Sequence, residues 1–170
     1  MREWIPISTS PKGRLALAAA REFGAHPYAE VTVAGLAAAA EVTTGALYHH
    51  FESKLGLYQF VRTDVERRLL DRMAGAATAT PTADMGARLS AALGVGFDFA
   101  VGARFTWLLS EPPMDEAHDA LAAEILLLFP SLARPIDAIL AAGWRAAVGS
   151  AARGMDPDDA RAALMRIRVA

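Results

Sequence analysis

Cysteine is absent from the 170 residues of this sequence. Without a thiol the chain has no disulfide framework, no thiolate nucleophile and no cysteine-based redox sensor. Long apolar runs are missing as well, since no stretch approaches the roughly 20 consecutive apolar residues that span a bilayer. Residues 1–10 also lack the apolar segment of a signal peptide. We therefore expect a cytoplasmic protein with no membrane partner.

The sequence also has no excess of basic residues. Its formal net charge is −2, and residues 1–60 hold five basic and five acidic residues, so that segment is neutral. Proteins that bind nucleic acid usually carry a basic surface. If this chain binds DNA, we expect few phosphate contacts, helped by helix N-termini, and a shallow dependence of affinity on salt.

Apolar residues are abundant, at 54% of the chain, and many of them are alanine. This composition is typical of a folded, helix-rich protein. Apolar positions recur at helical spacing, as at Leu15, Ala19 and Phe23. We expect an all-α fold with helices over residues 11–23, 33–40, 44–50, 53–73, 84–100, 103–110, 115–129, 132–152 and 157–169. The glycine at position 24 is expected to stop the first of them.

The small residues of segment 74–81 predict a loop and a domain boundary. We therefore expect an N-terminal head over residues 1–54, a linking helix and loop over 55–80, and a helical body over 81–170. The arginines and acids of residues 62–72 alternate, which indicates a solvated face with ion pairs rather than a second DNA-binding surface.

The most informative stretch is residues 31–54, which predict two short helices with a tight turn between them. Val33, Leu36, Ala37 and Ala40 lie on one face of the first helix. In the second, Thr43 is placed to cap the N-terminus and Leu47 points inward. Neither helix is long enough to be stable alone, so each must pack on a neighbour. This arrangement predicts a helix-turn-helix that presents its second helix to a DNA major groove.

The outward positions of the second helix are suited to DNA. Small residues let its backbone approach the base edges, while hydroxyl, imidazole and ammonium groups can donate to phosphates and fix the register. The outward residues are Thr44, Gly45, Ala46, Tyr48, His49 and His50, and Lys54 follows at the start of the next helix.

These residues also carry a family resemblance. The segments Leu36-Ala37, Ala40-Glu41-Val42-Thr43, Gly45-Ala46-Leu47-Tyr48, His50-Phe51 and Ser53-Lys54 resemble the signature of the TetR family of bacterial transcriptional regulators. The resemblance implies an all-helical homodimer. Each subunit would have a three-helix DNA-binding head and a larger helical body for ligand binding and dimerisation.

The resemblance also implies residue roles. Thr43 would cap the recognition helix, and Thr44, Gly45 and Ala46 would lie nearest the bases. The positions of Tyr48, His50, Lys54 and Thr32 match contacts to the DNA backbone.

Two positions depart from the family pattern. Glu41 stands where the turn usually has glycine, and a left-handed conformation there costs roughly 1–2 kcal/mol for another residue. Gly56 replaces the usual acidic residue that would form a capping box with Ser53.

The body contains many large apolar side chains, and most of them are expected to be core. A subset could line a ligand cavity, as the resemblance implies. We select Phe97, Trp107 and Trp144, with Arg104 or His118 as polar contacts. A mainly apolar lining predicts an apolar or aromatic small ligand. No cofactor and no metal site is expected.

The expected dimer interface is unusual, because family members usually end in two long helices and this chain reaches Ala170 after one shortened version. The interface is therefore expected to be smaller, or to be built from residues 132–152 and the last helix. The sequence predicts a ligand-responsive regulator, most simply a repressor that binds a palindromic double-stranded DNA operator. The alternative is a helical small-molecule-binding dimer that has weak or lost DNA binding.

The sequence supports an enzymatic function less than either of these two functions. The pair His49 and His50 points in diverging directions along a helix, which is poor geometry for one metal ion. The acids of segment 111–118 are better explained as a solvated helix start.

Overall fold

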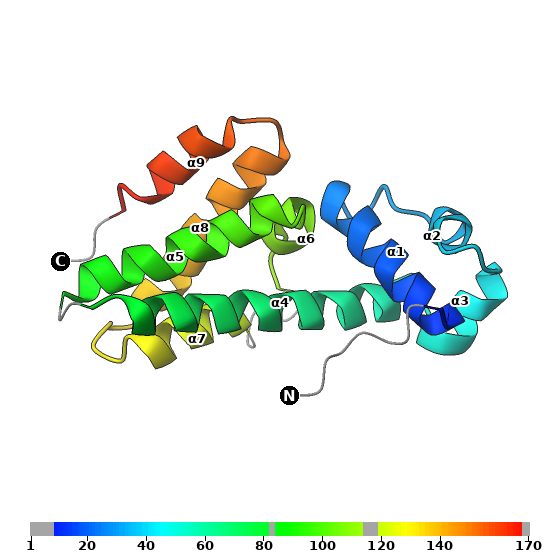
Figure 1. Ribbon diagram of the computed structural model, residues 1–170, viewed down its shortest axis with the longest axis horizontal. Helices are drawn as coiled ribbons and strands as arrows, with labels where there is room; N and C mark the ends of the chain where they lie inside the picture. The colour runs from blue at the N-terminus through cyan, green and yellow to red at the C-terminus, as the bar shows by residue number, and fades with distance from the viewer. Residues whose placement is uncertain (1–8, 82–83, 114–118, 168–170) are drawn as a thin grey trace.

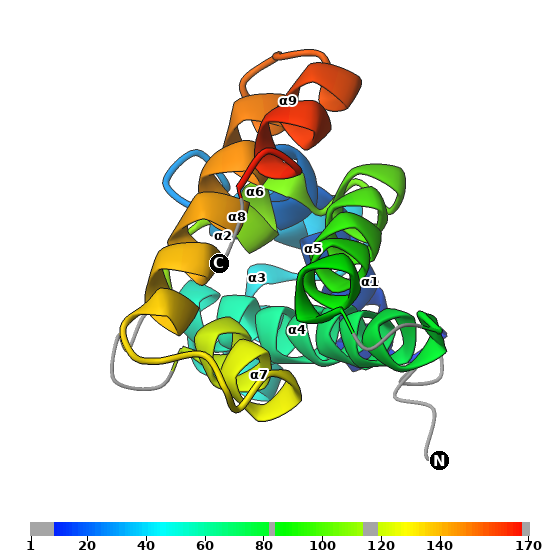
Figure 2. The same cartoon turned by 90° about the vertical axis from the view of Figure 1, so that its left-hand side faces the viewer.

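The computed structural model describes residues 9–81, 84–113 and 119–167, and all regular structure in them is helical. Three helices pack at one end of a long helix, α4 (Figure 1), and the remaining helices gather along its other half (Figure 2). The head comprises α1 (Pro11–Ala25), α2 (Val33–Ala39) and α3 (Thr44–Phe51), followed by α4 (Lys54–Ala79). The body comprises α5 (Met85–Gly102), α6 (Thr106–Ser110), α7 (Ala120–Leu128), α8 (Ile136–Ala152) and α9 (Pro157–Leu164). The expectation of an all-α fold is confirmed.

Side-chain caps begin the helices of the head. The hydroxyl oxygens of Ser10, Thr32, Thr43 and Ser53 each accept a hydrogen bond from the backbone N–H three residues later, at 2.9–3.3 Å. Each bond satisfies one of the N–H groups that a helix start leaves free. The expected cap at Thr43 is confirmed.

Two helices end in Schellman motifs whose left-handed residue is not glycine. At the end of α2, Glu41 has φ 54°, and the N–H of Val42 bonds back to the carbonyl of Ala37. At the end of α5, Arg104 has φ 58°, and the N–H of Phe105 bonds to the carbonyl of Ala100. Glycine is the usual residue at such positions. The strain expected at Glu41 is therefore present in the turn between α2 and α3.

Gly24 does not stop the first helix, as the sequence suggested, because α1 continues to Ala25. The glycine is instead required by packing. A Cβ at this position would collide with the carbonyl oxygen of Arg104, in the junction between α5 and α6. The head therefore touches the body at a site where only a hydrogen atom fits.

Several expected boundaries in the second half of the chain are wrong. Residues 74–79 are the last turns of α4 rather than a loop, because this segment is mostly alanine and its Ala77 is fully buried. The helix expected from residue 132 begins at Ile136, after a non-helical approach. The helix expected from residue 103 is shortened to Thr106–Ser110 by the turn at Arg104.

The buried stripe of α4 joins head and body into a continuous core. Its members are Leu57, Tyr58, Val61, Val65, Leu69, Met73 and Ala77, all less than 5% exposed. The same cluster reaches Phe23 in the head and Trp144 in the body. One helix therefore contributes side chains to both ends of this core. No helix in the described part of the chain is long and apolar enough to cross a bilayer.

Candidate nucleic-acid interface and ligand cleft

Helix α3 presents the outward face that its sequence predicts. Leu47 and Phe51 are buried, whereas Thr43, Thr44, Gly45, Tyr48 and His49 are exposed, and Ala46 and His50 are partly exposed. Tyr48 retains 53% of its surface. Adjacent exposed small residues leave the helix backbone accessible near its N-terminus, which is the geometry a recognition helix needs in a major groove.

An arginine of α1 holds the turn between α2 and α3. The guanidinium of Arg14 donates from Nε to the carbonyl of Ala40 at 3.0 Å and from a terminal nitrogen to the carbonyl of Glu41 at 3.4 Å. These carbonyls belong to the Schellman motif that ends α2. Arg14 thus fixes the angle between the two helices. Sequence spacing gives no signal for this role, because its partners lie 26 and 27 residues away.

Lys54 also stabilises the head through hydrogen bonds to backbone carbonyls. Its ammonium donates to the carbonyls of Tyr28 and Val31, at 2.9 and 3.0 Å, and lies 4.0 Å from the centre of the Tyr28 ring. The resemblance implied a phosphate contact for this residue. In this structure the ammonium group holds the loop before α2, next to Thr32, whose hydroxyl caps α2. A phosphate contact by Lys54 stays a prediction.

The junction between α3 and α4 explains why position 56 is glycine. Glu52 has φ 64°, and the N–H of Ser53 bonds to the carbonyl of Phe51 at 2.7 Å. This tight turn brings the Phe51 carbonyl against Gly56, where a Cβ would collide with it. An acidic residue at position 56 is therefore incompatible with this turn, and Ser53 caps α4 without the reciprocal half of a capping box.

Three aromatic rings pack the head against the beginning of α4. Tyr58 packs edge-on against Phe23 and Tyr28, with ring centroids 5.0 and 4.9 Å apart. The hydroxyl of Tyr58 accepts a hydrogen bond from the Arg62 guanidinium at 2.9 Å. Burial raises the pKa of Tyr58 above its ordinary value of 10.0, although Arg62 opposes the shift.

Arg62 extends this network to the body. Besides Tyr58 and Glu66, its guanidinium donates to the carbonyls of Glu111 and Pro112, which follow α6, at 2.8 and 3.0 Å. The sequence suggested a solvated charged face here. Ion pairs are present, for example between Arg67 and Asp64, but Arg62 and Asp64 are only 5% and 7% exposed. The solvated reading is therefore wrong for these two residues.

The described residues among those expected to line a ligand cavity lie in the core and around α6. Phe97 and Trp144 are core residues, 1% and 0% exposed, and the Trp144 indole N–H donates to the carbonyl of Leu93. Trp107 lies in α6, and Arg104 is exposed in the turn before it. His118 lies outside the described residues. None of the four described residues lines the cleft beside α7.

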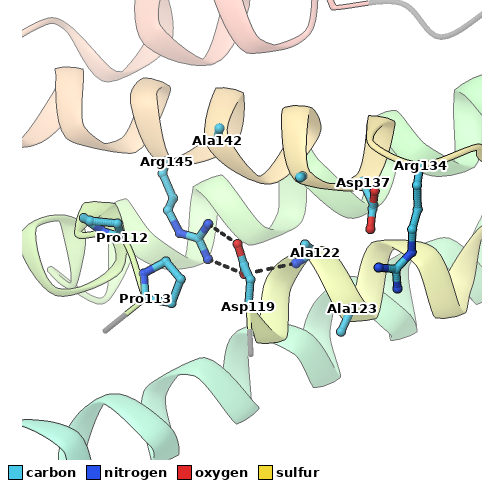
Figure 3. Close-up of a pocket in the computed structure, with 10 residues that line it drawn as sticks. Pro112, Pro113, Asp119, Ala122, Ala123, Arg134, Asp137, Ala142 and Arg145 are labelled. Carbon is cyan, nitrogen blue, oxygen red and sulfur yellow. Dashed lines mark hydrogen bonds and ion pairs between the residues drawn. The ribbon is translucent and has the colours of Figure 1, made fainter. Parts of the chain in front are cut away.

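A cleft of about 430 Å³ opens between α7, α8 and the segment after α6 (Figure 3). Arg145 and Asp119 meet in it as a bidentate ion pair, with N–O distances of 2.6 and 2.7 Å. Burial alone would raise the pKa of Asp119. Hydrogen bonds from Arg145 and from the N–H groups of Ala122 and Leu121 outweigh that effect, so its pKa lies below 3.8. The other lining residues are Pro112, Pro113, Ala123, Arg134, Asp137, Ala138 and Ala142.

Metal chemistry finds no support in the described segments, where no three His, Asp or Glu side chains are close enough to share a metal ion. The rings of His49 and His50 contact each other edge-on, with centroids 4.9 Å apart.

Comparison with known proteins agrees with this geometry. Residues 16–60 match the family model described as "Bacterial regulatory proteins, tetR family". Among solved structures, the chain is similar to a tetR-family transcriptional regulator from Streptomyces coelicolor. The identity is 22% and the TM-score 0.58, over 91% of this chain and 77% of that one. Curated protein sequences give no significant match. Residues 16–60 of this chain, which contain α2 and α3, are thus similar to the N-terminal region of tetR-family regulatory proteins.

Proposed function

We propose that this chain is a homodimeric repressor that binds a palindromic operator in the cytoplasm and is released by a small ligand. The observation that carries the proposal is the exposed N-terminal half of α3, in a head where Arg14 holds the turn before α3 and Lys54 holds the loop before α2. A rigidly supported helix end of this kind suits base reading in a major groove.

Within this proposal, Thr44, Gly45 and Ala46 approach the bases, because their small side chains leave room for the groove floor. Tyr48, His49 and His50 contact phosphates at the edges of the groove. Thr32 and Thr43 lie at the N-termini of α2 and α3, where backbone N–H groups add to anion binding. We include Lys54 as a phosphate contact only if its ammonium leaves the carbonyls that it now holds.

The coupling of ligand to DNA is proposed to run through Arg62. Pro112 lines the cleft and its carbonyl accepts from Arg62, which in turn bonds Tyr58 beside the head. A ligand that moves the segment after α6 would change the position of α4. It would then change the spacing of the two recognition helices, which must match one DNA turn of roughly 34 Å. This works only if the ligand binds the two spacings with different affinity.

For the dimer we propose a contact through α8 and α9. Ile139 on α8 is 62% exposed, and Ala142 and Ala146 continue the same outward face at helical spacing. Ile139→Glu should then give monomers in light scattering. Leu127→Glu is the matched control, because Leu127 on α7 is even more exposed, at 73%, but lies outside the proposed interface. Loss of the dimer in both variants, or in neither, would contradict this assignment.

The regulator proposal is tested by DNA retention. Genomic fragments, including the region beside the protein's own gene, are selected at low salt, and affinity for the retained fragment is then measured at two salt concentrations. Tyr48→Ala should weaken binding by about tenfold, since it removes an exposed contact of the recognition helix. The control His26→Ala, in the loop after α1, should leave affinity unchanged.

The alternative is a helical small-molecule-binding dimer with weak or lost DNA binding. It is favoured by the acidic Glu41 in the turn and by the occupied ammonium of Lys54. If no genomic fragment is retained above the level of random DNA, the regulator proposal is wrong and this alternative replaces it. We assign no catalytic residues under either proposal.

A further inference from the structure

One end of the cleft carries two opposite charges without partners. Asp137, in the first turn of α8, is only 6% exposed and lines the cleft. Figure 3 shows its carboxylate directed into the space above α7, with the guanidinium of Arg134 nearby. Within residues 9–81, 84–113 and 119–167, no group forms a hydrogen bond or ion pair with either side chain.

The position of Asp137 in its helix does not account for its burial. A carboxylate in the first turn of a helix gains only a small stabilisation from the helix dipole. The cost of burying a carboxylate without a partner is larger than this gain. The described structure leaves no buried polar side-chain atom sealed without a partner, so the Asp137 oxygens must face the open cleft. They are therefore accessible to a ligand.

The cleft also contains one ion pair in which both charges are already neutralised. Arg145 and Asp119 neutralise each other through two hydrogen bonds, so they hold no free charge for a ligand. The free charges, Asp137 and Arg134, stand three residues apart at the start of α8. A ligand that satisfies both must carry one cationic and one anionic group.

We propose that this cleft binds a small zwitterion of the α-amino-acid class. Its ammonium would donate to Asp137, and its carboxylate would accept from the planar guanidinium of Arg134. The side chain of the amino acid would lie along the alanines of α7 and α8 and the prolines after α6. The volume of about 430 Å³ lies within the range of sites for small molecules.

This inference rests on the proposed ligand response and revises the ligand expected from sequence. An apolar or aromatic molecule without charge would leave the Asp137 carboxylate buried without a partner. It would also fail to use the Arg134 guanidinium. A zwitterion is favoured because it satisfies both groups at once and leaves the net charge of the site unchanged.

The test measures binding of the common L-amino acids, one at a time, to the full chain by thermal shift and calorimetry. At least one should bind at millimolar concentration or below. Its decarboxylated and deaminated analogues, which keep only one of the two charges, should each bind about tenfold more weakly. Absence of binding by every amino acid, or equal binding of an analogue, overturns the proposal.

Two variants test whether the amino acid binds in this cleft. Asp137→Asn and Arg134→Gln should each lower affinity by about tenfold or more, because each removes one charged partner. Asp158→Asn, in the first turn of α9, and Arg166→Gln are exposed controls and should bind as the wild type does. Equal losses in variants and controls, or in neither, would overturn the assignment to this cleft.

We also measure DNA binding by the same preparations. This measurement tests the regulator proposal separately from the proposed ligand class, which rests on it. Wild-type protein that binds its operator but no amino acid refutes the ligand class alone. Protein that binds an amino acid but no DNA refutes the regulator proposal and leaves the cleft assignment in place. Retained operator binding by the Asp137→Asn variant also establishes that the variant is folded.

Discussion

The guanidinium of Arg62 donates to the carbonyl oxygen of Glu111 at 2.8 Å, although 49 residues separate them along the chain. Arg62 is buried in α4, and Glu111 follows α6 beside the cleft. With Tyr58, Glu66 and Pro112 as its other partners, this arginine connects the Tyr58 hydroxyl beside the head to the segment after α6. A buried cation with this many partners is costly to disturb.

Arg62→Lys should therefore lower the free energy of unfolding by about 3 kcal/mol, because an ammonium cannot reproduce the fork of donors. Chemical denaturation measures this change. Arg67→Lys is the control, since Arg67 is half exposed and its ion pairs should contribute less than about 1 kcal/mol. Similar losses in both variants would argue against a special role for Arg62.

Glu41→Gly should stabilise the protein by about 1 kcal/mol, because φ 54° is unstrained for glycine. It should also tighten DNA binding at low salt, because a carboxylate leaves the helix-turn-helix. Glu41→Gln separates the two effects, since it removes the charge and keeps the strain. A glutamine variant as stable as the glycine variant would show that backbone strain is not the cause.

Gly24→Ala should lower the free energy of unfolding by about 1–3 kcal/mol, because the new Cβ would push α1 away from the Arg104 carbonyl. Gly75→Ala is the matched control in α4, where a Cβ would meet nothing within 4 Å. That substitution should stabilise the helix by about 0.5–1 kcal/mol. Opposite signs in thermal unfolding would support the packing role of Gly24, whereas two stabilised variants would contradict it.

The variant Lys54→Gln distinguishes a structural role of the Lys54 ammonium from a contact with a DNA phosphate. If the ammonium mainly holds the Tyr28 and Val31 carbonyls, the variant should lose thermal stability and its DNA affinity should keep the wild-type salt dependence. If it contacts a phosphate, the slope of log affinity against log salt should fall by about one unit. We expect the loss of stability, and an unchanged melting temperature would contradict it.

The Asp119–Arg145 pair should make stability depend on acid. Because the pKa of Asp119 is below its ordinary value of 3.8, the unfolded chain binds a proton more readily than the folded protein. The contribution is thus fully present above about pH 4 and is lost as the pH falls through the folded pKa.

Asp119→Asn should accordingly show a smaller loss of unfolding free energy between about pH 6 and about pH 3 than the wild type. Asp71→Asn, which alters an exposed residue, should follow the wild-type curve. An identical loss of unfolding free energy at low pH in all three proteins would show that the Asp119–Arg145 pair does not cause the acid dependence.

The sequence alone determined the helices of the head and their caps. Local signals suffice there, because Thr43 sits directly before its helix and Leu47 recurs with Phe51 at helical spacing. The family signature lies in the same segment, which is the part that a family model matches. The outward face of α3 follows from the same periodicity, since the buried positions fix the exposed ones.

Only the tertiary structure decided which residues meet across the chain. The side chains of Arg14, Lys54 and Arg62 donate hydrogen bonds to backbone carbonyls far away in the sequence. Because every residue has a carbonyl, no pattern of side chains identifies the partners. The same limit applies to the cleft, whose position no pattern of side chains indicates. Large aromatic side chains such as Trp144 fill the core by burying apolar area, whereas the cleft forms where small residues of α7 and α8 leave space.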